Sequence, residues 1–575
     1  MSAPQPRNPF ASPAAAPGAR TTAERKLLAA LLVGLALWLF LPAGWRTLWS
    51  PDEGRYAEIP REMVASGDWV TPRLDGVKYF EKPPLFYWSA ALAIAAFGVD
   101  ERALRAVPAL FALLGAAATI LAARRLWGTH AAFMAGVALG TMPLYFGIAN
   151  LLAIDMAVSA LITVTLLAFL AAAQSTGRRR DLWLGAFYGA AALATLAKGL
   201  IGIAIPGMVI LAWLSLTGRW RDLTRYRMVF GTLLFLVIAG PWHWMVQARN
   251  PEWAWFYFVH EHFLRYTTTL HKRSEPFWFY LPVVIFGAFP WSAMIPAAAL
   301  RWWRERRSAT DRAQWDAGLF CVIWFVVVLG FFSLAGSKLP TYVVPALPPL
   351  ALLLAADAAR GNGLGRGAAW IVAATCALVA IAIAAVPWFA ESRASLQLAV
   401  SLLGIWRWLL ALSFVGVGAA ALVSWQKPEF TRRLAGSTAL MLLVLAGAAT
   451  KYNDERSVKS LAAVLAPRLS ASDLVAAYHC YPQDLAPYLG RRVAIAGWIG
   501  ELEFGASVED QSAWLLDQDA FQRRWNGQGI VYVVAEPKDF PGLQAASTRP
   551  PRVLAQTRKY VLAVNQPAPG PGAAP

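Results

Sequence analysis

The chain has 575 residues, of which 58% are hydrophobic and 15% are charged, and it contains 27 tryptophans. This composition excludes a soluble globular protein and is typical of a protein that crosses a membrane many times. The formal net charge of +18 does not predict a nucleic-acid partner. The lysines and arginines fall mostly in short clusters between apolar runs, where they set membrane topology.

The N-terminal stretch, residues 1–23, is rich in alanine and proline and has no apolar period, which predicts a disordered cytoplasmic leader. Arg25 and Lys26 then precede an apolar run from Leu27 to Trp45. A basic flank keeps the N-terminus of a first span on the cytoplasmic side. A cleaved signal peptide is the alternative, but the run is long for one and no A-x-A-like site follows it.

The next segment, Ser50 to Tyr87, gathers acids, bases and aromatic side chains in a chain that is otherwise mostly apolar. Its charged residues are Asp52, Glu53, Arg55, Glu58, Arg61, Glu62, Asp68, Arg73, Asp75, Lys78, Glu81 and Lys82. The apolar run that follows, Leu85 to Val99, is shorter than the ~20 residues that a span needs, so we expect it to lie in the membrane interface. This placement also puts every basic cluster on the cytoplasmic side.

With that placement, the apolar runs predict about thirteen transmembrane helices. They cover residues 27–45, 103–123, 129–147, 156–173, 181–198, 200–217, 227–247, 278–300, 314–333, 342–358, 367–388, 402–424 and 434–450. The membrane domain is then 24–450, with its first periplasmic loop at 48–102 if the host is a Gram-negative bacterium. An odd number of spans sends the C-terminal part to the periplasmic side as well.

The C-terminal part changes to short β-rich runs at 474–478, 493–496, 530–534 and 560–564, separated by helical or turn stretches. We expect a small periplasmic α/β domain over 451–565 and a disordered tail over 566–575. The predicted fold class is therefore a polytopic α-helical membrane protein with periplasmic juxtamembrane helices and a small C-terminal α/β domain.

This topology places polar groups from distant segments on one outer face. A charged residue at a helix centre costs ~3 kcal/mol, so Asp155 and Lys198, at the ends of apolar runs, should line a cavity. Side chains with the chemistry to bind phosphate oxygens are Lys82, Arg55, Lys198, Arg265 and Lys338. Side chains able to orient sugar hydroxyls or amines, act as a general base or hold a divalent cation are Asp52, Glu53 and Asp155.

Two alternatives stay open for these groups. A purely structural role as interface anchors or caps has equal weight for each residue except Asp52, Lys82 and Asp155, where function is favoured. A second set, His260, Glu261, His262 and His271 together with Glu81, could supply metal ligands, although histidine at a membrane interface more often lies on the surface or contacts substrate. The sequence thus establishes no cofactor and leaves a divalent cation open.

Several short motifs carry a resemblance to a known family. They are Asp52, Glu53, Arg55 and Tyr56; REM at Arg61–Met63; GDW at Gly67–Trp69; YFEKPPL at Tyr79–Leu85; Asp155; Ala197-Lys198-Gly199; and the run from Ser337 to Tyr342. On these residues the chain closely resembles the bacterial lipid A aminoarabinose transferases, of the integral-membrane, lipid-phosphate-dependent glycosyltransferase superfamily. The resemblance is strong from about Trp49 to Leu350 and fades in the C-terminal domain.

The resemblance implies a first periplasmic loop built of two juxtamembrane helices, an inner-membrane location, and transfer of 4-amino-4-deoxy-L-arabinose from undecaprenyl phosphate to lipid A phosphates. Such masking lowers the negative charge of the outer membrane, so cationic peptides such as polymyxin bind less well. The expected catalytic residues are Asp52, Asp155 and Lys82. The expected substrate-binding residues are Glu53, Arg55, Tyr56, Tyr79, Glu81, Lys198, His262, Arg265, Lys338 and Tyr342.

A lipid A phosphate is already anionic at neutral pH, so this reaction does not require a base. Our hypothesis is that Asp52 and Asp155 position the sugar and its ammonium, while Lys82 and Arg55 neutralise the leaving undecaprenyl phosphate. Two other functions remain as alternatives. One is a related membrane glycosyltransferase that moves another polyprenyl-linked sugar to protein or glycan, and the other is a lipid-linked sugar transporter, against which the absence of a visible repeat argues.

Overall fold

The structure, a computed structural model, describes residues 17–264, 275–305, 312–390, 393–425, 427 and 429–566. Most of the predicted leader and all of the predicted tail except Gln566 lie outside these ranges. The first helix, α1 (Pro17–Phe40), begins before the predicted start of the first span at Leu27 and ends before its predicted end.

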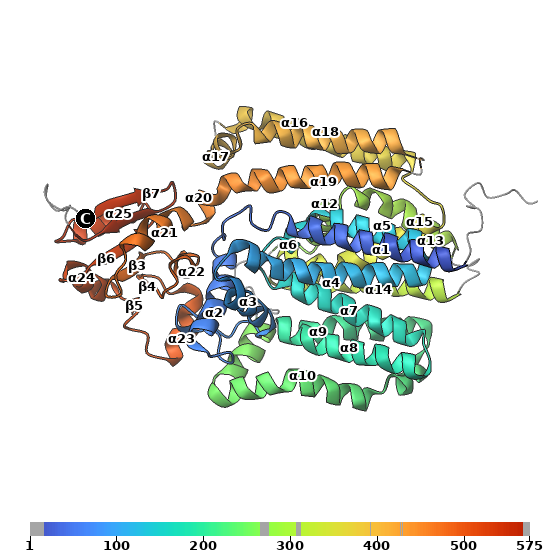
Figure 1. Cartoon of the computed structure of the whole chain (residues 1–575), viewed down its shortest axis with the longest axis horizontal. Coiled ribbons are helices and arrows are strands. Elements are labelled where there is room, and N and C mark those ends of the chain that lie inside the picture. The colour runs from blue at the N-terminus through green and yellow to red at the C-terminus, as the bar shows by residue number, and fades with distance from the viewer. Residues whose placement is uncertain are drawn as a thin grey trace, which may run out of the picture.

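Long apolar helices run side by side through most of the molecule (Figure 1). Within the described residues, eight are long and apolar enough to cross a membrane. They are α4 (Glu101–Trp127), α7 (Asp155–Ala173), α10 (Met228–Arg249), α14 (Arg312–Leu334), η4 with α15 (Pro340–Ala359), α16 (Arg366–Ala390), α18 (Trp406–Ser424) and α19 with its short extension (Phe430–Arg456). This confirms a helical membrane-protein fold.

Two further spans result if each of two bent helix pairs crosses as one unit, which gives up to ten. The first pair, α5 (Thr129–Thr141) and α6 (Pro143–Ala149), bends by 67°. The second pair is α12 (Tyr280–Gly287) and the helix from Trp291 to Arg304, which overlaps α13 (Ile295–Glu305), and it bends by 104°. The remaining predicted spans coincide with α1, α8 (Gly177–Lys198) and α9 (Ile201–Thr217), and α9 has only 17 residues.

Local sequence explains where several of these helices begin and end. The Asp100 side chain accepts hydrogen bonds from the backbone N–H groups of Arg102 and Ala103, which caps the start of α4. Gly199, with a φ of 84°, ends α8 in a conformation that favours glycine and turns the chain into α9. This turn matters for the site because Lys198 is the last residue of α8.

Each end of the helical bundle carries its own set of charged residues. Ion pairs at one end join the basic clusters to neighbouring helices: Arg124 with Glu24, Arg227 with Asp181, and Arg301 with Asp357. The other end carries the loop between α1 and α4, whose elements are α2 (Asp52–Ser66), the hairpin β1 (Arg73–Leu74) and β2 (Val77–Lys78), and α3 (Leu85–Phe97). This loop contains the two helices that the resemblance implies, and α3, with 13 residues, is short for a span.

The C-terminal part folds around a six-stranded sheet with the strand order β5-β4-β3-β6-β8-β7. Its strands are β3 (Leu474–Tyr478), β4 (Ala494–Ala496), β5 (Leu515–Leu516), β6 (Val531–Ala535), β7 (Arg552–Gln556) and β8 (Val561–Val564). The strands β3, β4, β5 and β6 are parallel to one another, while β8 pairs antiparallel with β6 and β7. The four predicted β-rich runs correspond to β3, β4, β6 and β8, and the sequence did not predict β5 or β7.

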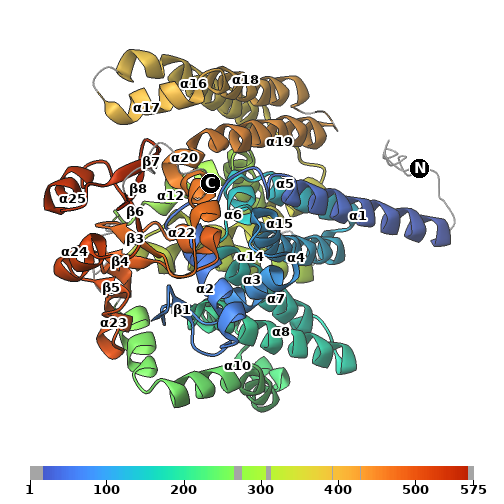
Figure 2. The ribbon, with the colours of Figure 1, turned by 60° about the vertical axis from the view of Figure 1, so that its left-hand side comes forward.

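This sheet lies beyond the end of the bundle that carries α2 and α3 (Figure 1). On another side, α16, α18 and α19 pack on one another as a separate layer against the other helices, as both views show (Figure 2). Between sheet and bundle, α2 contacts the short helix α22 (Leu485–Leu489), and α23 (Glu503–Val508) contacts β2. The segment from Ser50 to Tyr87 therefore lies between the two parts of the molecule.

Candidate active site

A cavity of about 860 Å³ lies where the helical bundle, the α2–α3 loop and the C-terminal domain meet. Eight of the residues predicted for the site line it, and they come from four separate segments of the chain. They are Asp52, Arg55, Tyr56, Glu81, Lys82, Asp155, Lys198 and Tyr342. The structure thus brings together side chains that the predicted topology placed on one face.

Arg55 is the centre of the first charged cluster. Its guanidinium donates to Asp52 Oδ1 at 2.5 Å, to the Tyr79 hydroxyl at 2.8 Å and to Glu501 Oε2 at 2.5 Å. Burial raises the pKa of Glu501, and the charge of Arg55 opposes that shift. Tyr79 does not line the cavity itself but holds Arg55 in place.

The second cluster forms at the ends of two packed helices. Asp155 is the first residue of α7 and Lys198 is the last residue of α8, and their side chains form an ion pair. The Lys198 ammonium also lies 4.5 Å from the centre of the Tyr342 ring. A cation held over an aromatic face and beside one carboxylate keeps a fixed position at the cavity wall.

Lys82 forms the third cluster. Its ammonium donates to Glu261 Oε2 at 3.2 Å and to the backbone carbonyl of Glu81 at 2.8 Å. Glu261 belongs to a π-helix, η2 (Trp255–Leu264), which also brings Trp255, Phe256 and His260 to the cavity. π-Helical turns are rare and are found often at functional sites.

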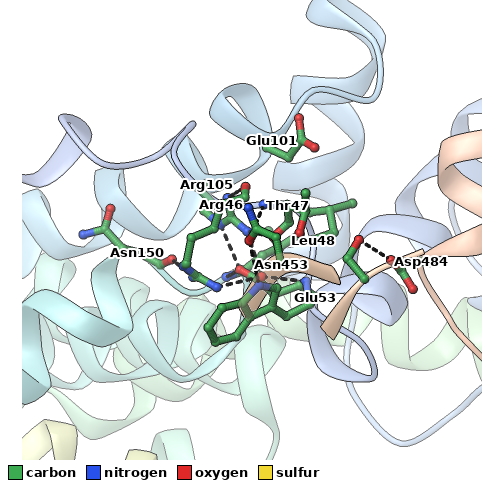
Figure 3. Close-up of polar contacts among 12 residues, drawn as sticks. Arg46, Thr47, Leu48, Glu53, Glu101, Arg105, Asn150, Asn453 and Asp484 are labelled. Atoms are coloured by element: carbon green, nitrogen blue, oxygen red, sulfur yellow. Dashed lines mark hydrogen bonds and ion pairs between the residues drawn. The ribbon is translucent and has the colours of Figure 1, made fainter. Parts of the chain in front are cut away.

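Glu53 does not line the cavity and is fully buried, and Figure 3 shows it among its polar neighbours. Its carboxylate receives two hydrogen bonds from Arg105, at 2.9 and 2.8 Å, and two from the backbone N–H groups of Leu152 and Trp49. Arg46 Nη1 lies 3.5 Å from Glu53 Oε2, and Arg46 Nη2 donates to the Asn150 carbonyl at 3.0 Å. Glu53 therefore joins the start of α2 to α4 and to the segment that leads into Asp155.

The same network reaches the start of the C-terminal domain (Figure 3). Asn453 Oδ1 accepts from the Thr47 N–H and from the Trp49 indole, and the Asp484 carboxylate accepts from the Ser50 hydroxyl at 2.5 Å. Arg105 also donates to three backbone carbonyls, those of Ala43, Arg46 and Thr47. One buried arginine thus fixes the whole turn between α1 and α2.

Of three other predicted residues, one does not line the cavity and two fall at least partly outside the residues that the structure describes. Lys338 is buried and donates to the backbone carbonyl of Ala335 at 2.8 Å. The side chain of His262 and the whole of Arg265 lie outside the described residues. Among the residues predicted as possible metal ligands, His271 also lies outside the described residues. Of that set, the His260 ring stacks on Phe256 at 4.8 Å and Glu261 pairs with Lys82.

The C-terminal domain supplies cavity residues that sequence reasoning missed, namely Gly500, Glu501, Glu503, Phe504 and Ser507. Phe504 stacks on Phe256 with ring centres 3.9 Å apart. No charge cluster or motif marks these residues, and the resemblance fades in this region. The domain can approach closely because Gly505 lies against the backbone of Lys78, where an added Cβ would be 2.2 Å from the carbonyl oxygen.

Acids outnumber bases among the described residues that line the cavity. The carboxylates belong to Asp52, Glu81, Asp155, Glu261, Glu501 and Glu503, and the cations to Arg55, Lys82 and Lys198. Cations placed among carboxylates suit a ligand that carries both a phosphate and an amine. Among the described residues, Glu58, Glu62 and Asp75 form a group whose possible metal-ligand atoms all lie within 4.8 Å of one another, and this group is not part of the lining.

Comparison with known proteins shows the class of protein to which the chain belongs. Residues 81–244 match the family described as dolichyl-phosphate-mannose-protein mannosyltransferase, and residues 461–565 match the aminoarabinose transferase C-terminal domain. The fold is also that of a solved relative: the structure of ArnT from Cupriavidus metallidurans bound to undecaprenyl phosphate is 31% identical, with a TM-score of 0.81 over 94% of this chain and 98% of that one. The protein is a membrane glycosyltransferase that uses a polyprenyl phosphate-linked sugar donor.

Full-length relatives define the group more narrowly. The chain is 32% identical over 521 residues to the undecaprenyl phosphate-alpha-4-amino-4-deoxy-L-arabinose arabinosyl transferase of Erwinia tasmaniensis, covering 86% of this chain and 90% of the relative. It is 32% identical over 508 residues to a protein of the same name from Sodalis glossinidius, covering 85% and 89%. The chain belongs to this family of arabinosyl transferases.

Proposed function

We propose that this protein transfers 4-amino-4-deoxy-L-arabinose from undecaprenyl phosphate to the phosphate groups of lipid A. The observation that carries the proposal is the cavity in which Lys82, Arg55 and Lys198 meet Asp52 and Asp155, in a chain of this family. The cations suit the phosphates of donor and acceptor, and the carboxylates suit the amine and hydroxyls of the sugar. Undecaprenyl phosphate bound to the similar ArnT structure supports the donor.

The reaction exchanges one glycosyl phosphate bond for another. The bond between the sugar C1 and the donor phosphate oxygen breaks, a lipid A phosphate oxygen bonds to C1, and undecaprenyl phosphate leaves. Positive charge develops on the sugar ring in such transfers, and negative charge develops on the leaving phosphate. Asp52 and Asp155 then stabilise the ring and hold the sugar ammonium, while Lys82 and Arg55 stabilise the leaving group.

The positions of the other predicted residues divide them into two roles. Tyr56, Glu81, Lys198 and Tyr342 line the cavity and contact substrate directly in this proposal. Glu53, Tyr79 and Lys338 act indirectly, because each is buried and bonded to protein groups that position the cavity wall. Glu501 and Glu503 join the set as additional acids for the amino sugar, and substrate contacts by His262 and Arg265 stay predictions.

We further propose thirteen membrane spans in the inner membrane, with the cavity and the C-terminal domain in the periplasm. The basic clusters at the opposite end of the bundle support this orientation, because positive charge is retained on the cytoplasmic side. The domains are then residues 24–450, with the loop at 48–102, and 451–565. Masking lipid A phosphates from this side lowers membrane charge and gives resistance to polymyxin and other cationic peptides.

Mass spectrometry of lipid A tests the function. A polymyxin-sensitive host that lacks its own transferase expresses the unaltered chain, Lys82→Ala or Lys78→Ala. Lys78 is the matched control, since it lies in the same loop but pairs with Glu252 and Glu509 away from the cavity. We expect a pentosamine-sized mass gain with the unaltered chain and with Lys78→Ala, and at least a hundredfold less with Lys82→Ala, roughly as for a lost charge-stabilising donor.

A different sugar mass, or a gain on protein instead of lipid A, would assign the chain to a related glycosyltransferase. Radiolabel that changes leaflet without a new covalent bond would indicate transport. Equal mass gain with Lys82→Ala and the unaltered chain would remove Lys82 from the site while leaving the transferase activity in place.

A further inference from the structure

The segments that follow two neighbouring strands of the C-terminal domain lead toward the active cavity, the cavity described above between this domain and the helical bundle. The strands β3 and β4 are parallel and end at Tyr478 and Ala496. The segment after β3 carries Gln483, and the segment after β4 carries Glu501, which lines the active cavity. Ligand sites in open α/β sheets lie outside the carboxyl ends of the strands. The same edge of this sheet supplies residues to the active cavity.

Gln483 holds the Glu501 carboxylate from the side of the C-terminal domain. Gln483 is buried, and its amide Nε2 donates to Glu501 Oε1 at 2.8 Å. The other carboxylate oxygen, Oε2, accepts from Arg55 Nη1 at 2.5 Å and from the Tyr79 hydroxyl at 3.3 Å. Because a carboxylate with one oxygen bonded to a buried amide cannot rotate freely, Gln483 sets the direction from which Oε2 meets Arg55.

Close backbone packing joins the same two partners a second time. Gly54, the residue before Arg55 on α2, is buried, and an added Cβ there would be 2.5 Å from the Gln483 carbonyl carbon. A larger residue at this position would therefore push the segment after β3 away from α2. The backbone contact at Gly54 and the hydrogen bonds through Glu501 together form a closed ring that connects Gln483 to Arg55.

The ring fixes one nitrogen of the Arg55 guanidinium and leaves the other to an exchangeable partner. Nη1 bonds to Glu501, whose side chain is 19% exposed, whereas Nη2 bonds to Asp52, whose side chain is 61% exposed. An incoming phosphate replaces the exposed carboxylate more readily than the buried one, and the displaced Asp52 is then free to bind the sugar. We propose that Gln483 is a positioning residue that, by fixing Glu501, aims Arg55 Nη2 at the phosphate of the polyprenyl donor. This inference rests on the role of Arg55 in the proposed function.

Binding of undecaprenyl phosphate to the purified full-length chain tests this role, because the lipid carries the phosphate without a sugar. Gln483→Met keeps the length of the side chain but removes the amide donor, and we expect its dissociation constant to rise about tenfold. Arg55→Met should raise it roughly a hundredfold, since the guanidinium itself is lost. Gln511→Met is the matched control and should bind as the unaltered chain does, because Gln511 accepts from Arg492 at 2.6 Å and does not line the active cavity.

The two variants of the ring give distinguishable failures. An effect of Arg55→Met without one of Gln483→Met would overturn this inference alone. Unchanged binding by Arg55→Met would overturn both the inference and the proposed role of Arg55. Mass spectrometry of lipid A measures the transferred sugar separately, so neither result decides which sugar the chain transfers.

A conservative variant, Gln483→Glu, separates positioning from loosening of the domain. The titratable groups that face Glu501 are Arg55, Tyr79, Glu81, Tyr87 and Tyr481. At pH 8.5 the added carboxylate repels Glu501, and binding should be about tenfold weaker than in the unaltered chain at the same pH. At pH 6 the added carboxyl shares a proton with Glu501 and replaces the amide as donor, so binding should recover to within about threefold.

Ser50→Ala is the control for loosening, because it removes the 2.5 Å hydrogen bond from Ser50 to Asp484 in the same loop without touching Glu501. Its binding relative to the unaltered chain should be the same at both pH values, and Gln483→Met should stay weak at both. An equal loss at pH 6 and pH 8.5 in Gln483→Glu would show that Gln483 only packs the loop, and would overturn the positioning role.

Discussion

Helix α2 carries two fully buried glutamates, Glu53 and Glu58, that face different parts of the molecule. Glu53 faces the membrane helices, where Arg105, Arg46 and two backbone N–H groups surround its carboxylate. Glu58 faces the C-terminal domain, where Arg61 donates to both of its oxygens, at 2.7 and 2.6 Å. Glu62 and Asp75 bring two more carboxylates within 4.8 Å of it.

The two environments shift acidity in opposite directions. Burial alone would raise the pKa of Glu53, but the charges of Arg105 and Arg46 and the hydrogen bonds outweigh it and lower that pKa to about 2. Burial, together with the charge of Glu58, raises the pKa of Asp75 to about 8. Burial and the charge of Glu58 also raise the pKa of Glu62 well above its usual value. On one side of α2, Glu53 therefore stays ionised at neutral pH. On the other side, which we call the proton-holding side, Asp75 and Glu62 are protonated at neutral pH.

Among the substitutions that test this difference between the two sides of α2, removing Arg105 should have the largest effect on stability and turnover. Arg105→Met leaves the Glu53 carboxylate buried with only Arg46 as a cation, a change that costs ~3–5 kcal/mol in similar buried pairs. Because Glu53 also holds the Leu152 N–H, three residues before Asp155, turnover should fall about a hundredfold. Thermal unfolding and turnover at saturating donor measure the two effects.

The double variant Glu53→Gln with Arg105→Met separates charge burial from positioning. Replacing both partners removes the uncompensated charge, so much of the stability should return. Turnover should stay low, because the arginine that holds the turn between α1 and α2 through three carbonyls is still missing. Recovery of turnover along with stability would show that Arg105 has no positioning role.

Arg61→Met should have a smaller effect on the other side of α2. Arg61 is less buried than Arg105, with 12% rather than 1% of its side chain exposed, so water can partly replace its contact with Glu58. We expect a loss of ~1–3 kcal/mol in stability and a change in turnover of less than about threefold, since neither Glu58 nor Arg61 lines the active cavity. A loss of turnover equal to that of Arg105→Met would contradict the proposed difference between the two faces.

The sequence predicted the parts of the site that are close together in the chain. Asp52, Arg55, Glu81 and Lys82 lie in one dense polar segment, and Asp155 and Lys198 stand out as charges at the ends of apolar runs. Such charges are costly in lipid, so their presence indicates a cavity. The helical fold and the main strands of the C-terminal sheet follow from hydropathy and from β-rich runs in the same way.

What the sequence could not predict depends on pairing between distant segments. Glu53 follows Asp52, and its sequence position suggests a second acid in the cavity. Its carboxylate instead binds Arg105, 52 residues away, and does not line the cavity. Glu501 is 446 residues from Arg55, and no local sequence pattern predicts the contact between them. Gly54 gives no signal either, although an added Cβ there would lie 2.4 Å from the Asp484 nitrogen, where the C-terminal domain meets α2.

On the proton-holding side of α2 the comparison predicts a gradual pH dependence of stability, smaller over one pH unit than the loss expected from removing Arg105. The folded-state pKa of Asp75 is raised from 3.8 to about 8, so its contribution to stability is complete below the lower value and is lost as pH rises to the higher one. Between these values stability should fall by up to about 1.4 kcal/mol for each pH unit. The protonated carboxyl lies at the domain junction, where Asp75 Oδ1 accepts from the Val493 N–H at 2.9 Å.

Asp75→Asn mimics the protonated form and should flatten the decline in unfolding temperature from pH 5 to 8. Glu509→Gln is the control, because hydrogen bonding from Arg73 lowers the pKa of Glu509. The stability that Glu509 adds is lost only as pH falls below the usual carboxyl range, so this variant should keep the decline. An Asp75→Asn profile as steep as that of the unaltered chain would mean that Glu62 carries the proton alone, and Glu62→Gln should then give the flat profile.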